Sequence, residues 1–270
     1  MALRFDGELY MVESQDGWYW PTKHIQRTKW ADWVQFAENA DFNVVHLPLS
    51  AEMKTKYNEK ASNEFFWKTA GHTYGYHNFI WGWIDTKYDN FPPLLNYKLL
   101  PVVMELIESL DPNTAYLIYG SGLNKRLGTE NLKIGEIIAE TQKRGIQLED
   151  LYTIPEIDGW IYHGAGPLDG FNYVCSAYVI GHYIAAGLFE GHGEQQATEW
   201  SPKDVYQGKF FDLNRTFTDG CKEDDSGLPV CQFMGKYKLT LPGLNSVDLY
   251  PKMNYNCPSM NPNYERPDGC

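Results

Sequence analysis

The stretch Phe171-Asn172-Tyr173-Val174-Cys175-Ser176-Ala177-Tyr178-Val179 decides how this chain of 270 residues is interpreted. A glycine-rich loop comes before it, and apolar residues recur at helical spacing after Cys175 until Gly187. The pattern predicts a helix over residues 175–186 with a cysteine in its first turn. Free amides and the helix dipole at such a position stabilise a thiolate. A buried structural cysteine explains the local pattern equally well.

The order of possible partners along the chain favours one arrangement. A thiol nucleophile needs a base, usually an imidazole, and a polar group that orients this base. The histidines after Cys175 are His182 and His192. His182 lies two turns along the same helix, out of reach of the sulfur, and His192 falls in a loop. We therefore expect the base to precede the cysteine in the sequence.

The first third of the chain contains well-marked elements. Residues 3–13 predict a β-hairpin with its turn at Asp6-Gly7. Residues 30–39 predict an amphipathic helix and residues 43–49 a buried strand. Residues 51–67 predict a further helix, with Ser50 as its N-cap.

Helices are also expected at residues 99–110 and 134–144, with a glycine-rich loop over 159–170. Together these elements predict an α+β fold in which an antiparallel sheet packs on helices. We expect a domain over residues 1–194 with a long insertion at about 85–155. Residues 195–270 would form a cysteine-rich C-terminal extension packed on it.

This order of elements resembles the circularly permuted branch of the NlpC-type papain-fold cysteine hydrolases. Residues 2–7 match the end of that family's first strand and its turn, and residues 9–14 match the second strand. Residues 173–179 match the helix that carries the nucleophile. The resemblance covers about residues 1–84 and 159–190. It implies a papain-like fold in which Cys175 is the nucleophile and Glu13 orients the base.

The chain departs from the family at the base itself. The family's histidine lies on the first strand, and there is no histidine between Met1 and Glu13. The matching position falls a few residues before Met1. One hypothesis is therefore a thiol hydrolase of amide or ester bonds, with an upstream histidine and no cofactor. Its substrate would be a peptide, a cell-wall peptide or an acyl group. The other hypothesis is a catalytically inactive structural or binding module with protein partners.

Four further residues could border a cleft around Cys175, namely Tyr76, His77, His163 and Tyr173. Two histidines five residues apart, His72 and His77, are compatible with a metal site. No cysteine or carboxylate at ligand spacing accompanies them, so we expect no metal. Residues 124–126, Asn-Lys-Arg, are interpreted as a solvated basic turn.

The C-terminal fifth is rich in loop-forming residues and holds Cys221, Cys231, Cys257 and Cys270. Two disulfides could staple it, although sequence does not fix their connectivity. Asn214 begins a glycosylation sequon. These features favour a secreted, lysosomal or vacuolar glycoprotein, and the alternative is a cytoplasmic protein with free thiols.

Charge and hydropathy exclude some classes of partner. The net charge of −12 argues against nucleic acids and anionic membranes as partners. No apolar run reaches the roughly 18 residues that a membrane span requires. The first residues alternate like a strand and do not resemble a leader peptide.

Overall fold

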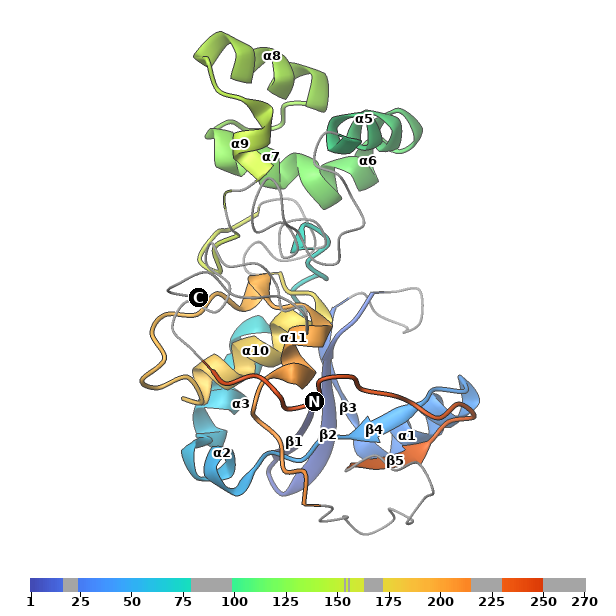
Figure 1. The fold of residues 1–270 in the computed structure, drawn as a ribbon. Coiled ribbons are helices and arrows are strands. Elements are labelled where there is room, and N and C mark those ends of the chain that lie inside the picture. The colour runs from blue at the N-terminus through green and yellow to red at the C-terminus, as the bar shows by residue number, and fades with distance from the viewer. Residues whose placement is uncertain are drawn as a thin grey trace.

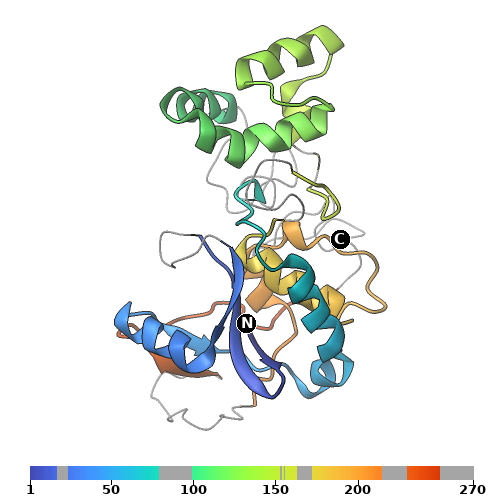
Figure 2. The same cartoon turned by 180° about the vertical axis from the view of Figure 1, so that it is seen from behind.

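The computed structural model describes residues 1–16, 24–78, 99–152, 154, 156–162, 172–214 and 230–249. The fold combines helices with small antiparallel sheets, which confirms the predicted α+β class. Figure 1 shows the sheets and the helices packed on them in one part of the molecule, and a group of helices, α5 to α9, in another. Figure 2 shows the same division from behind.

The predicted hairpin is present at the N-terminus. Strand β1 (Ala2–Phe5) pairs antiparallel with β2 (Glu8–Ser14), with Leu3 opposite Tyr10. The turn places Asp6 at φ 50° and Gly7 at φ 84°, the left-handed region that glycine tolerates best. Strand β3 (Ile25–Lys29), which the sequence did not reveal, pairs with the other edge of β2. β1 is thus an edge strand of the three-stranded sheet.

Two of the expected helical regions follow this sheet. Helix α1 (Trp30–Asn39) has the predicted bounds. The single helix expected over 51–67 is instead two helices, α2 (Ala51–Lys56) and α3 (Glu59–Thr69). Ser50 caps the first as predicted, accepting the amide of Met53 at 3.2 Å. Asn58 caps the second by accepting the amide of Ala61 at 3.0 Å, and this local cap separates the two helices.

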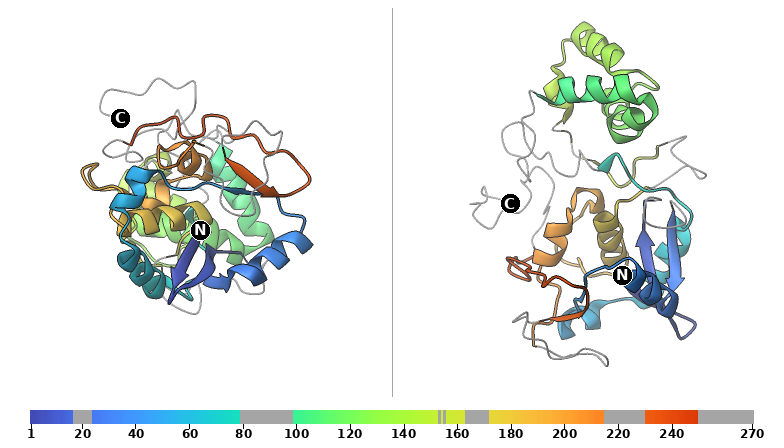
Figure 3. Two further views of the ribbon diagram at one scale, coloured as in Figure 1. Left: turned by 90° about the horizontal axis from the view of Figure 1, so that it is seen from below. Right: turned by 90° about the vertical axis from the view of Figure 1, so that its right-hand side faces the viewer.

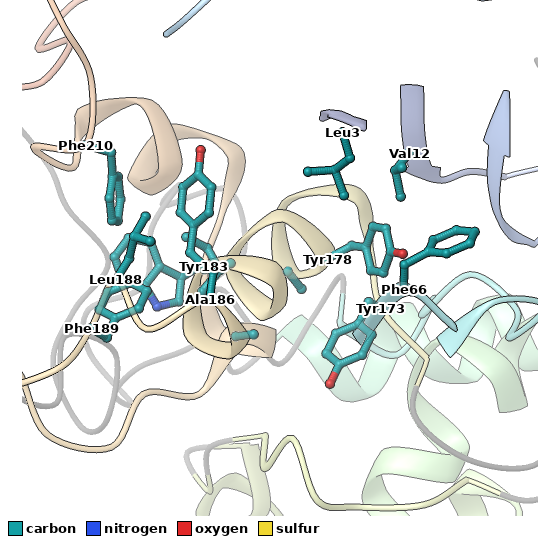
Figure 4. Packing of buried hydrophobic residues seen from close by; sticks show 14 of the residues in the cluster. Leu3, Val12, Phe66, Tyr173, Tyr178, Tyr183, Ala186, Leu188, Phe189 and Phe210 are labelled. Carbon is teal, nitrogen blue, oxygen red and sulfur yellow. The ribbon is translucent and has the colours of Figure 1, made fainter. Parts of the chain in front are cut away.

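Helix α10 (Cys175–Ala185) runs through the main hydrophobic core, as Figure 4 shows. Its packing is close because Gly181 lies against Phe65, whose ring a Cβ at position 181 would approach to 2.6 Å. Leu3 and Val12 of the sheet belong to the same cluster. One face of the sheet therefore covers α10.

The second core lies among helices α5 (Leu100–Leu110), α6 (Pro112–Ala115), α7 (Ser121–Leu127), α8 (Ile134–Arg144) and α9 (Leu148–Tyr152). A π-helical segment, Tyr116–Gly120, connects α6 with α7. The interpretation of residues 124–126 as a solvated turn is wrong, because they lie in α7. The Asn124 side chain is buried with four hydrogen bonds, and the Arg126 guanidinium is buried as well.

The C-terminal described residues return to the main core. Helix α11 (Pro202–Gln207) contacts α10, and the short 3-10 helix Ala197–Glu199 does so too. Strand β5 (Cys231–Met234) pairs with β4 (Val44–His46), which lies within the predicted strand region 43–49. These two strands form a separate small sheet, visible in both views of Figure 3.

Candidate active site around Cys175

Cys175 occupies the first position of α10. Val174 before it is extended, with φ −73° and ψ 168°, and the cysteine is exposed and free. The amide of Val174 is buried and donates to Oδ1 of Asn78 at 3.2 Å. The thiol is therefore held at the open N-terminal end of a helix whose entry is fixed by a side chain from another part of the chain.

The side chain of Tyr74 contacts the sulfur. Its hydroxyl lies 3.8 Å from Sγ of Cys175 and donates to it. Burial, followed by the charge of Cys175, raises the pKa of Tyr74, so the phenol keeps its proton and remains a donor.

Glycine makes this contact possible. The amide of Gly75 donates to the carbonyl of Tyr173 at 3.1 Å. A Cβ on Gly75 would lie 2.7 Å from the carbonyl oxygen of Asn172 and 2.6 Å from Oδ1 of Asn78. The backbone of residues 74–78 thus lies directly on the segment that leads into α10.

The end of β2 supplies further polar groups. Ser14 is buried and its hydroxyl donates to the carbonyl of Tyr173 at 2.5 Å. Asp16, two residues later, is hydrogen-bonded to Tyr76 and interacts electrostatically with Tyr74. Burial and then Asp16 raise the pKa of Tyr76 to about 12. Sequence reasoning missed Tyr74 and Asp16, although Asp16 continues the alternation of Val12 and Ser14.

Glu13 does not point where the resemblance implies. Its carboxylate accepts hydrogen bonds from Nε1 of Trp33 and from Gln15, each at 3.1 Å. Trp33 belongs to α1, and Met11, on the same face of β2 as Glu13, packs beside it. The expectation that Glu13 faces the N-terminal end of α10 is wrong, because that helix packs on the opposite face, beneath Val12 and Ser14.

His77 is buried in a polar cluster rather than exposed in a cleft. Its Nε2 lies 3.6 Å from Oε1 of Glu156, and its ring centroid is 4.2 Å from that of Tyr162. Nη2 of Arg126 lies 3.1 Å from the other oxygen of Glu156. Burial, followed by the charge of Arg126, lowers the pKa of His77 to about 3, so the ring is neutral and its contact with Glu156 is not an ion pair.

We call these four residues, His77, Arg126, Glu156 and Tyr162, the buried charge cluster. The hydroxyl of Tyr162 donates to Glu156 at 2.7 Å, and the amide of Glu156 donates to the Glu199 carboxylate. Burial raises the pKa of Glu156, and Arg126 opposes this shift. The cluster connects α7 to the main core beside Asn78, which holds the start of α10.

The other predicted residues are accounted for as follows. Tyr173 is 5% exposed and packs on Phe65, so its ring belongs to the core. Tyr76 is partly buried next to Tyr74, with ring centroids 5.2 Å apart. His163 lies outside the described residues. Asn214 is exposed. Cys231 is disulfide-bonded, whereas Cys221, Cys257 and Cys270 lie outside the described residues.

Imidazoles in the described part of the chain do not reach the thiol by a hydrogen bond. His182 is buried in the core, where its Nδ1 lies 2.8 Å from Oγ of Ser62. His46 lies on β4. Across the described residues, no group of three His, Cys, Asp or Glu side chains is arranged to hold a metal.

None of the described helices is both long and apolar enough to cross a bilayer. Comparison of the chain with family models, with curated proteins and with solved structures gives no match.

Proposed function

We propose that this protein is a thiol hydrolase of amide or ester bonds, with a permuted papain-like arrangement, in which Cys175 is the nucleophile. The observation that carries the proposal is the exposed thiol at the first position of α10 in contact with the Tyr74 hydroxyl. Reactive cysteines occur in such partly exposed helix-start positions, where amide groups stabilise the thiolate. Peptides, cell-wall peptides and acyl groups are all compatible substrates.

The reaction follows from these groups. The base takes the proton of the Cys175 thiol, and the thiolate attacks the substrate carbonyl, forming an S–C bond and an oxyanion as the C=O π bond breaks. The backbone N–H of Cys175 and the hydroxyl of Tyr74 are donors for this oxyanion. The leaving amine or alcohol takes a proton from the protonated base as the C–N or C–O bond breaks. Water then hydrolyses the thioester and restores the thiol.

The base in this proposal is a histidine upstream of Met1. Met1 pairs with Val12 through both backbone hydrogen bonds, at 2.7 and 2.8 Å. Extending β1 in the same register places the residue two positions before Met1 opposite Ser14. Ser14 faces α10, so a side chain at that position would face the helix that starts with Cys175.

The orienting carboxylate in this proposal is Asp16 rather than Glu13. Asp16 acts on both tyrosines beside the thiol, whereas Glu13 is bonded to Trp33 on the other face of the sheet. The setting we propose is secretory, lysosomal or vacuolar, as the cysteine-rich C-terminal region and the Asn214 sequon favour.

The second candidate is an inactive papain-fold module that binds protein partners. It is favoured by the finding that histidines of the described residues form no hydrogen bond with Cys175.

The deciding experiment uses a chain extended upstream of Met1 and a set of p-nitrophenyl esters and peptide anilides. The proposal predicts turnover that is lost in Cys175→Ala and falls strongly in Asp16→Asn, while Glu13→Gln keeps most of it. Absence of turnover in the extended chain with every ester and anilide would favour the binding module.

A further inference from the structure

A groove of about 730 Å³ runs along the edge of β1 that faces away from β2, and Cys175 is not among its lining residues. Ala2, Leu3 and Arg4 of β1 line one side of the groove, together with Met1. The other side is formed by residues 44–49, which include β4. The groove therefore separates the edge of the three-stranded sheet from the β4–β5 pair.

The backbone of β1 offers unused hydrogen-bonding groups to this groove. Met1 exchanges both backbone hydrogen bonds with Val12, so in the alternating antiparallel pattern the amides of Ala2 and Arg4 point away from β2. Among the described residues, neither amide has a backbone partner. The carbonyl of Arg4 accepts a hydrogen bond from the side chain of Asn63 at 3.1 Å. Within the described ranges, the Ala2 amide and carbonyl and the Arg4 amide are then the outward backbone groups without such a partner.

The side walls of the groove are apolar on both faces of the sheet. Leu9, Met11 and Trp30 line it on the α1 side. Leu49, Tyr57 and Tyr183 line it on the α10 side. Successive side chains of a strand inserted beside β1 would point alternately to these two walls. Because both walls are apolar, apolar side chains would pack against either of them.

The groove also carries charge. Arg4 and Lys54 both line it and both are exposed, against a single carboxylate, Glu59. The lining is thus net positive in a protein whose total charge is −12. This local excess favours a ligand with an acidic group near Arg4 and Lys54.

We propose that this groove binds an extended peptide segment of another protein, apolar on alternate residues and with an acidic residue at one end. The segment would add a strand to β1 through the Ala2 backbone groups and the Arg4 amide. An acyl chain fits the walls less well, because it would bury these backbone groups without hydrogen-bonding partners. The site does not depend on the proposed hydrolase activity, since Cys175 is not part of it.

The test measures binding of fluorescein-labelled acetylated pentapeptides by anisotropy. The set has Val, Ile, Leu or Phe at four positions and Asp or Glu at either end. Ala2→Pro removes the outward amide without touching the bonds to β2, and an edge strand tolerates proline there. Ala2→Val is the matched control. We expect the best peptide to lose about tenfold in affinity with Ala2→Pro and to bind Ala2→Val as tightly as the original protein.

Two further comparisons separate the interactions. A peptide N-methylated at the residue opposite Ala2 should lose affinity to a similar extent, since its side chains are unchanged. Arg4→Glu should weaken peptides that have an acidic end and spare their amide analogues. Circular dichroism and thermal unfolding check that each variant is folded.

Several results would overturn the proposal. One is that no peptide of the set binds. A second is that the best peptide binds Ala2→Pro and Ala2→Val equally well. A third is that oleate displaces the peptide while N-methylation of the peptide has no effect on its affinity. Self-association that disappears in Ala2→Pro, in place of peptide binding, would assign the edge to a second copy of the chain and also count against it.

Discussion

The surroundings of Cys175 and the buried charge cluster are polar regions that meet at residues 74–78, and they differ in burial and in bonding. Cys175 is exposed, and the Tyr74 hydroxyl donates to its sulfur. In the buried charge cluster, Arg126 and Glu156 side chains are 0% and 1% exposed and bonded to each other. The large pKa shift of His77 lies in the second region.

This difference indicates that the buried charge cluster contributes to the stability of the fold, whereas the surroundings of Cys175 determine the reactivity of the thiol. A strongly shifted pKa often marks a functional site, but a buried, fully bonded ion pair shifts pKa values for structural reasons. Here His77 and Glu156 are buried and bonded within the cluster, whereas the Cys175 thiol is exposed. We therefore expect changes in the cluster to alter stability first, and changes around Cys175 to alter reactivity first.

The largest effect on stability is expected for Arg126→Met. This change leaves the Glu156 carboxylate buried without its cation and should lower the free energy of unfolding by about 3–5 kcal/mol. Urea unfolding measures it. Lys125→Met, at the exposed neighbouring position, is the control and should stay within about 0.5 kcal/mol. Equal effects of the two changes would mean that the cluster does not stabilise the fold.

The pH dependence should be the next largest effect. The pKa of His77 is 6.5 in the unfolded chain and about 3 in the fold, so between these values the unfolded state binds the extra proton. The contribution of His77 to the free energy of unfolding is therefore fully present above pH 6.5. It falls as the pH decreases towards 3, by up to about 1.4 kcal/mol per pH unit. Glu156, with its raised pKa, acts in the opposite direction.

The contribution of His77 is isolated by comparing unfolding of the original protein and His77→Gln at pH 5 and pH 6. The variant should show a slope with pH that is smaller by about 1 kcal/mol per unit. Unchanged slopes would show that His77 is not held neutral in the fold.

A smaller loss is expected where the two regions meet, for Gly75→Ala. The added Cβ would come within 2.7 Å of the backbone carbonyl of Asn172, which cannot move aside cheaply. We expect a loss of about 1–3 kcal/mol in the free energy of unfolding. Alkylation of Cys175 should also slow, because the shift at Gly75 would displace Tyr74, which donates to the sulfur, and Asn78, which holds the amide of Val174. A Cβ on Gly159 would have no atom of the described residues within 4 Å, so Gly159→Ala serves as the control. If both substitutions were neutral, the close contact with residues 172–174 would be wrong.

The smallest of these effects is expected for Tyr74→Phe, which removes the donor to the sulfur. Stability should change by about 0.5 kcal/mol or less, while alkylation of Cys175 by iodoacetamide should slow about fivefold to tenfold. Tyr76→Phe removes a hydroxyl that bonds to Asp16 and should have the weaker effect on this rate. A larger effect of Tyr76→Phe would move the functional contact from Tyr74 to Tyr76.

Local signals predicted much of the fold. The Asp6-Gly7 turn, the Ser50 cap and the spacing of apolar residues predicted the hairpin and the helical regions of α1, α2 with α3, α5, α8 and α10, whereas α6, α7, α9 and α11 were not predicted. Each of these features depends on residues a few positions apart, so it can be recognised in a single sequence.

The site was harder to predict because its contacts span long distances in the sequence. Alternation along β2 correctly separates Glu13 from Ser14, but it does not say which helix covers which face. Arg126 looked solvated because its partner Glu156 lies 30 residues away. Tyr74 and Cys175 are 101 residues apart in the sequence. The close backbone approach that brings them together is marked in the sequence only by Gly75.

The most direct test of the central claim is the alkylation rate of Cys175 in the folded protein. Iodoacetamide is added without reductant, and the labelled residue is identified by peptide mass mapping over time, with Cys175→Ser as the control and the same chain in concentrated urea as the reference. If the helix start and Tyr74 activate the thiol, Cys175 alone is labelled, and faster in the fold than in urea. Labelling of Cys221 or Cys257 first, or a folded-state rate for Cys175 below the rate in urea, would contradict the account.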